Sequence, residues 1–254
     1  MNPGPLDLRR VRQALPDTRI EYHDSLPSTQ PVAIKLAEAG APSGTAVVAG
    51  QQTAGIGRQG HFWHSEPDSG LYVSLILYPP IEPATRPVLT LALGLATAEA
   101  IEQTTGVQPD LRWPNDIIMN NRKAAGILVQ LVGDAAVAGI GINVNHKDFP
   151  RDIADLATSL RLAAGRPQDP TELLIALLRS AGKYSQILHD DGKFPILEEF
   201  TRVSSYAHGK RVHVDMGDRQ IEGVTAGLTD YGFLQIRKSD GILETVLAGG
   251  VRPV

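Results

Sequence analysis

Most of the chain mixes helical and strand-like patterns of hydrophobic positions. Apolar residues recur with helical spacing between Ser28, whose hydroxyl can cap a helix, and Gly40, which predicts a helix there. Similar patterns predict further helices over residues 85–105, 171–188 and 195–206. Apolar and β-branched runs predict strands over residues 45–49, 71–78, 111–113 and 117–119, and a hairpin over 125–132 and 135–144. Because hairpins prevail over alternating strand–helix–strand units, we expect an α+β fold with a mixed, largely antiparallel sheet.

The pattern changes from His208 onward. Short apolar runs are divided there by glycines at 217, 223, 227, 232 and 241. Short strands with regular turn signals are typical of a small all-β barrel. We therefore predict two domains, residues 1–207 and residues 208–254.

Composition excludes several classes of protein. The 254 residues carry a net charge of -4 and no cysteine, so disulfides, cysteine-ligated zinc and a thiol nucleophile are excluded, and nothing favours nucleic acid as a partner. The most apolar long run, residues 88–101, is too short to span a bilayer, and the N-terminus lacks the apolar core of a signal peptide. We expect a cytoplasmic protein with no membrane partner.

The long polar segment over residues 51–70 contains Gly55-Ile56-Gly57-Arg58-Gln59-Gly60. A dinucleotide-binding fingerprint would need a helix directly after the glycines, whereas a strand is predicted here. The chain also lacks the H-R-D and D-F-G elements of kinases and the Gly-Lys-Ser/Thr of P-loop enzymes. Glycine amides and the Arg58 guanidinium can still surround an anion. A flexible surface loop remains the alternative.

A second cluster begins with Arg112-Trp113-Pro114-Asn115-Asp116 and continues through Lys123 to Gly126. The first segment joins an indole, a turn, an amide and a carboxylate within a few residues. Gly126 permits close approach to the backbone beside Lys123. Taken alone, the same residues fit a β-turn with a buried indole and a solvated lysine.

These segments occur in order with a third, Gly139-Ile140-Gly141-Ile142-Asn143-Val144. Together they resemble the biotin protein ligase family, whose catalytic domain carries G-R-G-R-x-G, K-W-P-N-D, K-x-x-G-I-L and G-x-G-I-N-V motifs. The resemblance is close over residues 28–145 and looser through residues 157–160 to the C-terminal barrel. It implies the mixed sheet shared with class II aminoacyl-tRNA synthetases, followed by an SH3-like barrel.

The resemblance also implies roles for single residues. The matches to biotin-binding positions are Ser28, Thr29, Gln30, Gln52, Gly55, Gly57, Arg58, Lys123, Gly126 and Gly139. The matches to nucleotide-binding positions are Ile56, Gly57, Arg58, Gly60, Trp63, Asn115, Lys123, Ile142 and Asn143, with Trp63 near the adenine. Gln30, Ile56 and Arg112 replace the family's asparagine, arginine and lysine. With one guanidinium in place of two, the loop is predicted to hold biotin and its adenylate more weakly.

The implied reaction uses ATP and Mg²⁺ to convert biotin to biotinyl-5'-AMP, and then transfers biotin to a lysine of a biotin carboxyl carrier protein. Biotin's carboxylate is ionised at neutral pH, so cations at Lys123 and Arg58 are expected to matter more than a general base. Asp116 is the candidate to orient or deprotonate the acceptor lysine, and Mg²⁺ is expected on the ATP phosphates, near Asp116. Family members often form dimers through the sheet edge, so monomer and homodimer both stay open.

Three other functions are possible for a chain with these features. A lipoate ligase would share the adenylation chemistry, but its R-R-x-x-G-G-G-x-V-x-H-D type motif is absent. Some biotin ligases also carry an N-terminal winged helix and repress transcription. Only about 20 residues precede the first strand-like segment here, too few for such a module. The C-terminal region has few aromatic residues for a proline-recognition groove.

Overall fold

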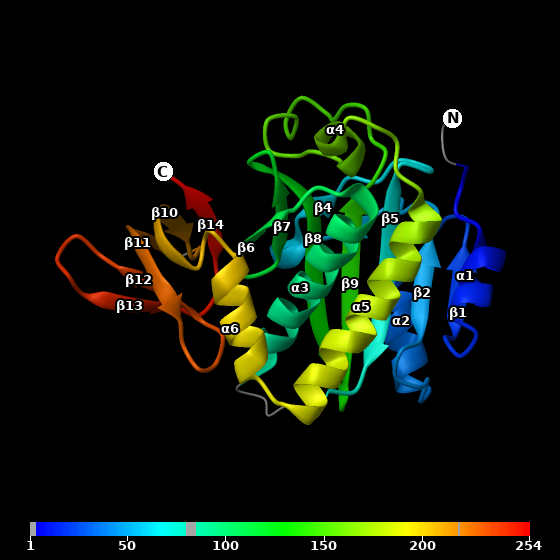
Figure 1. Cartoon of the computed structure of the whole chain (residues 1–254), viewed down its shortest axis with the longest axis horizontal. Coiled ribbons are helices and arrows are strands. Elements are labelled where there is room, and N and C mark those ends of the chain that lie inside the picture. The colour runs from blue at the N-terminus through cyan, green and yellow to red at the C-terminus, as the bar shows by residue number, and fades with distance from the viewer. Residues whose placement is uncertain (1–3, 80–84, 218) are drawn as a thin grey trace.

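The computed structural model describes residues 4–79, 85–217 and 219–254, with Gln59 and Arg86 as backbone only. Its centre is a seven-stranded sheet in the order β1-β2-β5-β9-β8-β7-β6 (Figure 1). The strands are β1 (Ile20–His23), β2 (Ala46–Ala49), β5 (Gly70–Leu77), β6 (Asp110–Arg112), β7 (Asp116–Met119), β8 (Arg122–Val132) and β9 (Ala135–Asn143). Strands β1 and β2 are parallel, and every other neighbouring pair is antiparallel. The expected α+β fold with a mixed, largely antiparallel sheet is confirmed.

Helices cover the two faces of the sheet unequally. Helices α3 (Arg86–Thr105) and α5 (Pro170–Asp190) lie in front of the sheet in Figure 1 and enclose the main core with strand residues such as Val73 and Leu75. Since side chains alternate along a strand, Ile76 points to the other face and packs there with Ala33 of α2 (Thr29–Glu38). Helix α2 covers only part of this second face, and the candidate site lies on the remainder.

Local sequence signals account for most element boundaries. The Ser28 hydroxyl accepts a hydrogen bond from the backbone N–H of Gln30 and caps α2, as predicted. The carboxylate of Asp169 caps α5 in the same way, and Gly106 ends α3 with a left-handed φ of 74°. Helices α1 (Leu8–Ala14), α4 (Leu160–Ala164) and α6 (Phe194–Val203) complete the helical set of the described residues.

The glycine-rich segment is more ordered than a long loop. It contains the short paired strands β3 (Gly55–Ile56) and β4 (Phe62–Trp63), with a single 3₁₀ turn between them. The polar segment over residues 51–70 therefore contains two short strands that its sequence did not predict. Pairing of Gly55 with Trp63 fixes the base of the loop and holds the indole close to the glycines.

The C-terminal region forms a five-stranded antiparallel sheet in the order β13-β12-β11-β10-β14. Its strands are β10 (His208–Asp215), β11 (Gln220–Leu228), β12 (Leu234–Arg237), β13 (Leu243–Val246) and β14 (Gly250–Pro253). Within the described part of the chain β13 and β14 do not pair, so the predicted SH3-like barrel is an open one. The Trp113 indole N–H donates to the Gly232 carbonyl at 2.9 Å and joins this sheet to the larger one.

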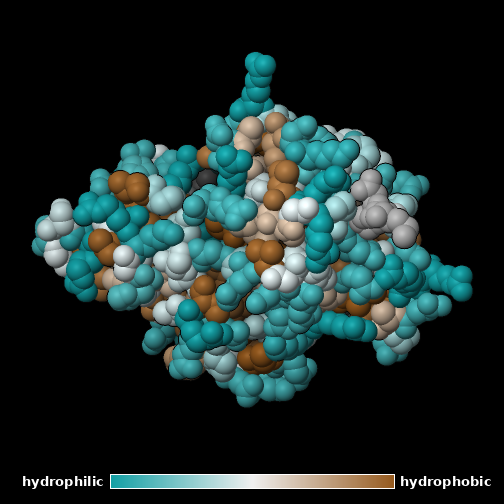
Figure 2. Space-filling model, turned by 45° about the horizontal axis from the view of Figure 1, so that its top comes forward, coloured by the Kyte–Doolittle hydropathy of each residue, from teal (hydrophilic) through white to brown (hydrophobic). Residues whose placement is uncertain are grey.

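The surface is that of a folded domain whose apolar residues are largely buried. Figure 2 shows a mostly hydrophilic face on which hydrophobic residues form small separate groups. Among the described residues, no helix is both long and apolar enough to cross a membrane.

Candidate active site

Glycines form the floor of a pocket on the second face of the sheet. Gly126 of β8 is paired with Gly141 of β9, and Leu128 is paired with Gly139 two residues along. The neighbouring strand β5 contributes Tyr72 opposite Gly141 and Ser74 opposite Gly139. Because alternate residues of a strand share a face, the side chains of Tyr72, Ser74 and Leu128 lie on the same face of the sheet as the bare backbone of the three glycines. The empty space in and in front of the pocket is about 460 Å³, which includes open solvent.

A buried network of hydrogen bonds forms one end of the pocket. The Gln52 amide oxygen accepts from the Thr29 backbone N–H at 2.8 Å, and the Thr29 and Ser74 hydroxyls are 2.8 Å apart. The Ser74 hydroxyl donates to the Gln30 amide oxygen at 2.9 Å, while the Gln30 NH₂ donates to the Val137 carbonyl at 3.0 Å. Each of these polar groups has a protein partner, so their orientations are fixed before any ligand arrives.

Lys123 forms the opposite, charged end. Its ammonium is 2.6 Å from the Asp116 carboxylate, which also accepts from the Arg112 guanidinium at 2.8 Å. Burial alone would raise the pKa of Asp116, but the charges of Lys123 and Arg112 outweigh it and hold that pKa below its usual value. The carboxylate is therefore ionised and shared between two cations, which orients Lys123.

Arg58 reaches the same end from the glycine-rich loop. Its guanidinium donates to the Asn115 amide oxygen at 2.9 Å, and the Asn115 NH₂ donates to the Ile127 carbonyl at 3.0 Å. Burial lowers the pKa of Arg58, and the nearby charge of Asp116 acts in the opposite direction. An arginine stays charged under such shifts, so a second cation lines the pocket beside Lys123.

The indole of Trp63 lies across the glycine floor. A Cβ atom at Gly141 would be 2.6 Å from its Cε2 atom, and one at Gly126 would be 3.1 Å from its Cζ3 atom. The Lys123 ammonium is 5.4 Å from the ring centroid, within cation–π range. The indole N–H is buried and has no partner among the described residues. The ring can stack on a flat ligand, and its N–H has no partner in the position that it occupies here.

The structure brings most of the residues predicted from sequence into this pocket. Those that line it are Ser28, Thr29, Gln30, Gln52, Ile56, Gly57, Arg58, Trp63, Asn115, Lys123, Gly126 and Gly139. Five predicted residues do not line it, namely Gly55, Gly60, Asp116, Ile142 and Asn143. Asp116 contacts Lys123, Ile142 is buried in the main core, and the Asn143 NH₂ donates to the Thr158 carbonyl.

Sequence reasoning missed other residues of the pocket. Tyr72 and Ser74 line it but belong to none of the motifs that carry the family resemblance, whereas Gly141 belongs to the Gly139–Asn143 backbone that was expected there. Ser74 had a detectable signal, because it is a single polar residue within the apolar run Leu71-Tyr72-Val73-Ser74-Leu75-Ile76-Leu77. The opposite holds for Trp113, which is 2% exposed and outside the pocket. For that residue the plain interpretation, a turn with a buried indole, is correct.

Comparison with known proteins agrees with this geometry. Residues 22–146 match the model of the biotin/lipoate A/B protein ligase family, and residues 207–251 match that of the biotin protein ligase C terminal domain. The bifunctional ligase/repressor BirA of Bacillus subtilis is 37% identical over 255 residues, covering 94% of this chain and 77% of that protein. A biotin–[acetyl-CoA-carboxylase] ligase of Mycobacterium tuberculosis is 29% identical and covers 91% of this chain and 89% of its own.

A solved structure extends the likeness to the whole fold. The biotin protein ligase from Aquifex aeolicus in complex with biotin and ATP has a TM-score of 0.83 and 31% identity, covering 93% of this chain and 99% of that one. Both domain models, the curated relatives and the structural neighbour lead to one conclusion: the chain belongs to the biotin protein ligase family.

Proposed function

We propose that this chain binds biotin and ATP in the glycine-floored pocket, forms biotinyl-5'-AMP and pyrophosphate, and transfers biotin to a lysine of a biotin carboxyl carrier protein. Membership of the ligase family supports the reaction. The contacts within the pocket indicate which residues would perform it and where each part of the substrates would lie.

The polarity of the pocket is the observation that carries the assignment. The hydrogen-bonded end at Ser74 and Gly139 and the cationic end near Gly126 lie on neighbouring rungs of the sheet, two residues apart along β8 and β9. That spacing is about 7 Å. Biotin has a polar ureido ring at one end and a carboxylate at the other, so it fits with its ring at the network and its carboxylate facing Lys123.

The first step needs charge neutralisation more than proton transfer. Biotin's carboxylate oxygen attacks the α-phosphorus of ATP, and the bond to pyrophosphate breaks. Negative charge accumulates on the phosphate oxygens, and Lys123 and Arg58 are positioned to stabilise it. Trp63 offers its ring to the adenine and, by covering the floor, keeps water from the mixed anhydride.

The residues that line the pocket do not form a site of their own for Mg²⁺. They include no carboxylate, and the nearby Asp116 is already shared between Arg112 and Lys123. Mg²⁺ commonly enters such sites through substrate phosphates and keeps several waters. We therefore infer that it arrives as the complex with ATP, and that Asp116 is not its ligand.

Asp116 is better suited to positioning than to taking a proton. A general base that acts near neutral pH benefits from a pKa near that pH, whereas two neighbouring cations hold the pKa of Asp116 below its usual value. We assign it the role of holding Lys123 in place. This replaces the idea that Asp116 deprotonates the acceptor lysine.

One assay tests the proposal. The chain is incubated with ATP, Mg²⁺, biotin and a carrier domain, and the mass of the carrier is measured. The expected result is a gain of one biotinyl group, and no gain with lipoate in place of biotin. Lys123→Ala should abolish most biotin-dependent exchange between ATP and pyrophosphate, while the control Lys35→Ala, exposed on α2, should keep it. Near-normal exchange in Lys123→Ala would refute the assigned role.

The place of the reaction in the chain and in the cell follows from the same proposal. We place adenylation in residues 1–207, because the lined pocket lies wholly within them. Since the reaction consumes ATP, we expect it in the cytoplasm. Monomer and homodimer stay open, and light scattering with size exclusion distinguishes them.

A further inference from the structure

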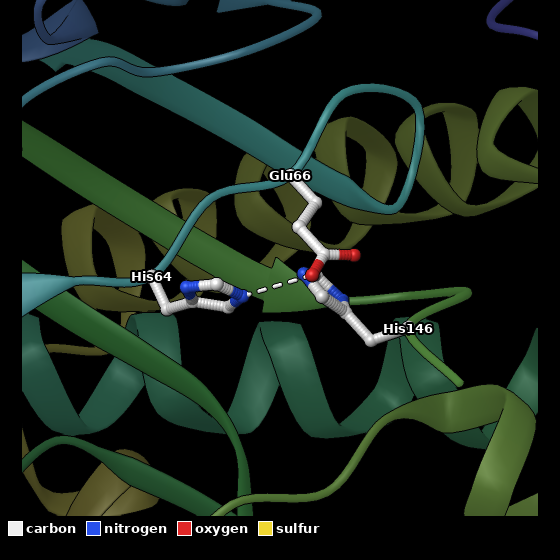
Figure 3. Close-up of side chains that lie close together, drawn as sticks. All are labelled: His64, Glu66 and His146. Carbon is white, nitrogen blue, oxygen red and sulfur yellow. Dashed lines mark hydrogen bonds and ion pairs between the residues drawn. The ribbon is translucent and has the colours of Figure 1, made fainter. Parts of the chain in front are cut away.

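Three side chains outside the pocket have the spacing of metal ligands. His64 and Glu66 follow β4, and His146 follows β9, so the group joins two segments that are distant in sequence. One ligand atom from each lies within 4.8 Å of the other two (Figure 3). No other group of three or more histidines and carboxylates among the described residues meets that spacing.

His146 is the residue that marks the group as more than a surface cluster. Its side chain is fully buried, and neither ring nitrogen has a hydrogen-bond partner in the described part of the chain. The Ser69 backbone lies close enough to raise the pKa of the ring, but it makes no hydrogen bond of normal geometry with it, and its carbonyl already accepts from the backbone N–H groups of Val144 and Asn145. Buried polar atoms in folded proteins are nearly always paired, so this imidazole lacks a partner that a bound ion would supply.

Aromatic packing explains where the ring lies but not what it binds. The His146 ring is stacked on Phe149, with centroids 5.1 Å apart and planes 17° from parallel, and the His64 ring is 5.7 Å away. Figure 3 shows the side chains of His64, Glu66 and His146 converging on one place. Burial lowers the pKa of His146 to about 4, with the charge of Glu66 acting in the opposite direction, so the ring is uncharged at neutral pH.

The distances suit a small cation after a modest adjustment. The His64 Nε2 and Glu66 Oε1 atoms are 3.2 Å apart. Ligands bound to zinc at about 2.0–2.2 Å lie roughly 3.3 Å from one another in a tetrahedron. His64 and Glu66 are partly exposed, with 22% and 42% of their side chains accessible, so they can move towards the fixed ring of His146.

We propose that His64, Glu66 and His146 bind a zinc-class divalent cation, which fixes the segment after Trp63 to the end of β9. Two imidazoles and a carboxylate are a typical zinc donor set, and water takes the fourth position. Mg²⁺ prefers oxygen ligands alone, so this ion is distinct from the one carried by ATP.

The proposed ion lies outside the pocket, but its ligands belong to segments that also line the pocket. Trp63 lines the pocket directly before His64, and the Ser65 hydroxyl accepts from the backbone N–H of Gln52, another lining residue. Strand β9, which ends just before His146, carries Gly141 of the floor. Fixing these segments to each other therefore holds Trp63 against its floor.

Metal binding alone provides the first test, without biotin or ATP, so its failure is separate from any failure of the proposed function. The full chain, free of a histidine tag, is stripped with a chelator and titrated with zinc, and bound zinc is counted by mass spectrometry after gel filtration. We expect one zinc per chain, and cobalt in its place should give the visible absorption of a tetrahedral site. Hydrogen exchange of residues 57–69 should slow when zinc is added.

Variants identify the ligands. His64→Gln and Glu66→Gln change partly exposed side chains and should weaken zinc binding by on the order of 100-fold or more. His146→Gln should weaken zinc binding to the same extent. If this buried substitution prevents folding, His64→Gln and Glu66→Gln still test the site. The matched control is His23→Gln, because His23 also lies 3.0 Å from a carboxylate, Glu21, but no third potential ligand among the residues that the structure describes joins this pair. It should bind zinc as the unaltered chain does.

Each other outcome counts against the proposal. Less than one zinc per chain at micromolar concentration, or equal binding by His64→Gln, Glu66→Gln and the unaltered chain, would overturn the site. Zinc binding with no change in the hydrogen exchange of residues 57–69 would overturn its role in fixing that segment.

Discussion

Substituting Gly141 by alanine should impair ATP binding through Trp63. The added Cβ would lie 2.6 Å from Cε2 and 2.9 Å from Nε1 of the indole, whereas carbon atoms in contact are about 3.5–4.0 Å apart. The ring must therefore move by about 1 Å or tilt away from its floor. The β9 backbone cannot yield, because it is paired on both sides, with β5 and with β8.

The size of the effect follows from what the ring is proposed to do. Stacking of a base on an aromatic side chain is worth about 1–3 kcal/mol. Loss of this stacking energy should raise the KM for ATP by about 5- to 150-fold. The KM for biotin should change less, because the network at Thr29 and Gln30 lies a rung away.

Pyrophosphate exchange, with ATP and biotin varied in turn, measures both constants. The chain has two tryptophans, so in a Trp113→Phe background Trp63 is the only tryptophan, and its fluorescence, excited selectively over that of tyrosine, reports ring movement. The control is Gly182→Ala on α5, where an added Cβ has no atom within 4 Å. If Gly141→Ala left the KM for ATP within twofold of the control value, Trp63 would not be the adenine-stacking residue.

Three further changes test other parts of the structure. Asp116→Asn should lower kcat by about 10- to 100-fold, which is 1.4–2.7 kcal/mol, yet leave the shape of the pH profile for biotin transfer unaltered; loss of the acidic limb, where activity falls at low pH, would restore the general-base role. Trp113→Phe should cost about 1–3 kcal/mol in urea unfolding by removing the bond to Gly232. With a chelator present, the free energy of unfolding should fall as the pH is lowered from 6.5 towards 4. In that range His146 is protonated in the unfolded chain but stays neutral in the folded one, where its pKa is about 4. That loss is about 2 kcal/mol at pH 5 and should disappear in His146→Phe.

Hydrophobic patterning predicted the large elements because their signals are local. The run after Ser28, the hairpin of β8 and β9, and the caps of α5 are each specified within a few residues of sequence. Helices α1 and α4 were missed, since they have only 7 and 5 residues. Such short helices depend on tertiary packing more than on their own pattern.

The candidate site was only partly predictable for a different reason. The motifs identified Lys123 and Arg58, but the partners of these residues depend on which strands lie next to each other. Sharing of Asp116 between Lys123 and Arg112 requires the β7–β8 register, and Ser74 joins the network only because β5 is next to β9. The His64–Glu66–His146 group also needs the loop after β4 to meet the end of β9, which no local pattern specifies.

The glycine floor limits how the range of acyl substrates can be changed by engineering. Backbone forms that surface at Gly126, Gly139 and Gly141, so any substitution there removes volume from the pocket and none can add it. A longer or bulkier analogue of biotin must gain its space from the walls, where Leu128 and Ile56 carry side chains that can be shortened. Libraries aimed at new acyl groups should therefore vary the walls and leave the floor alone.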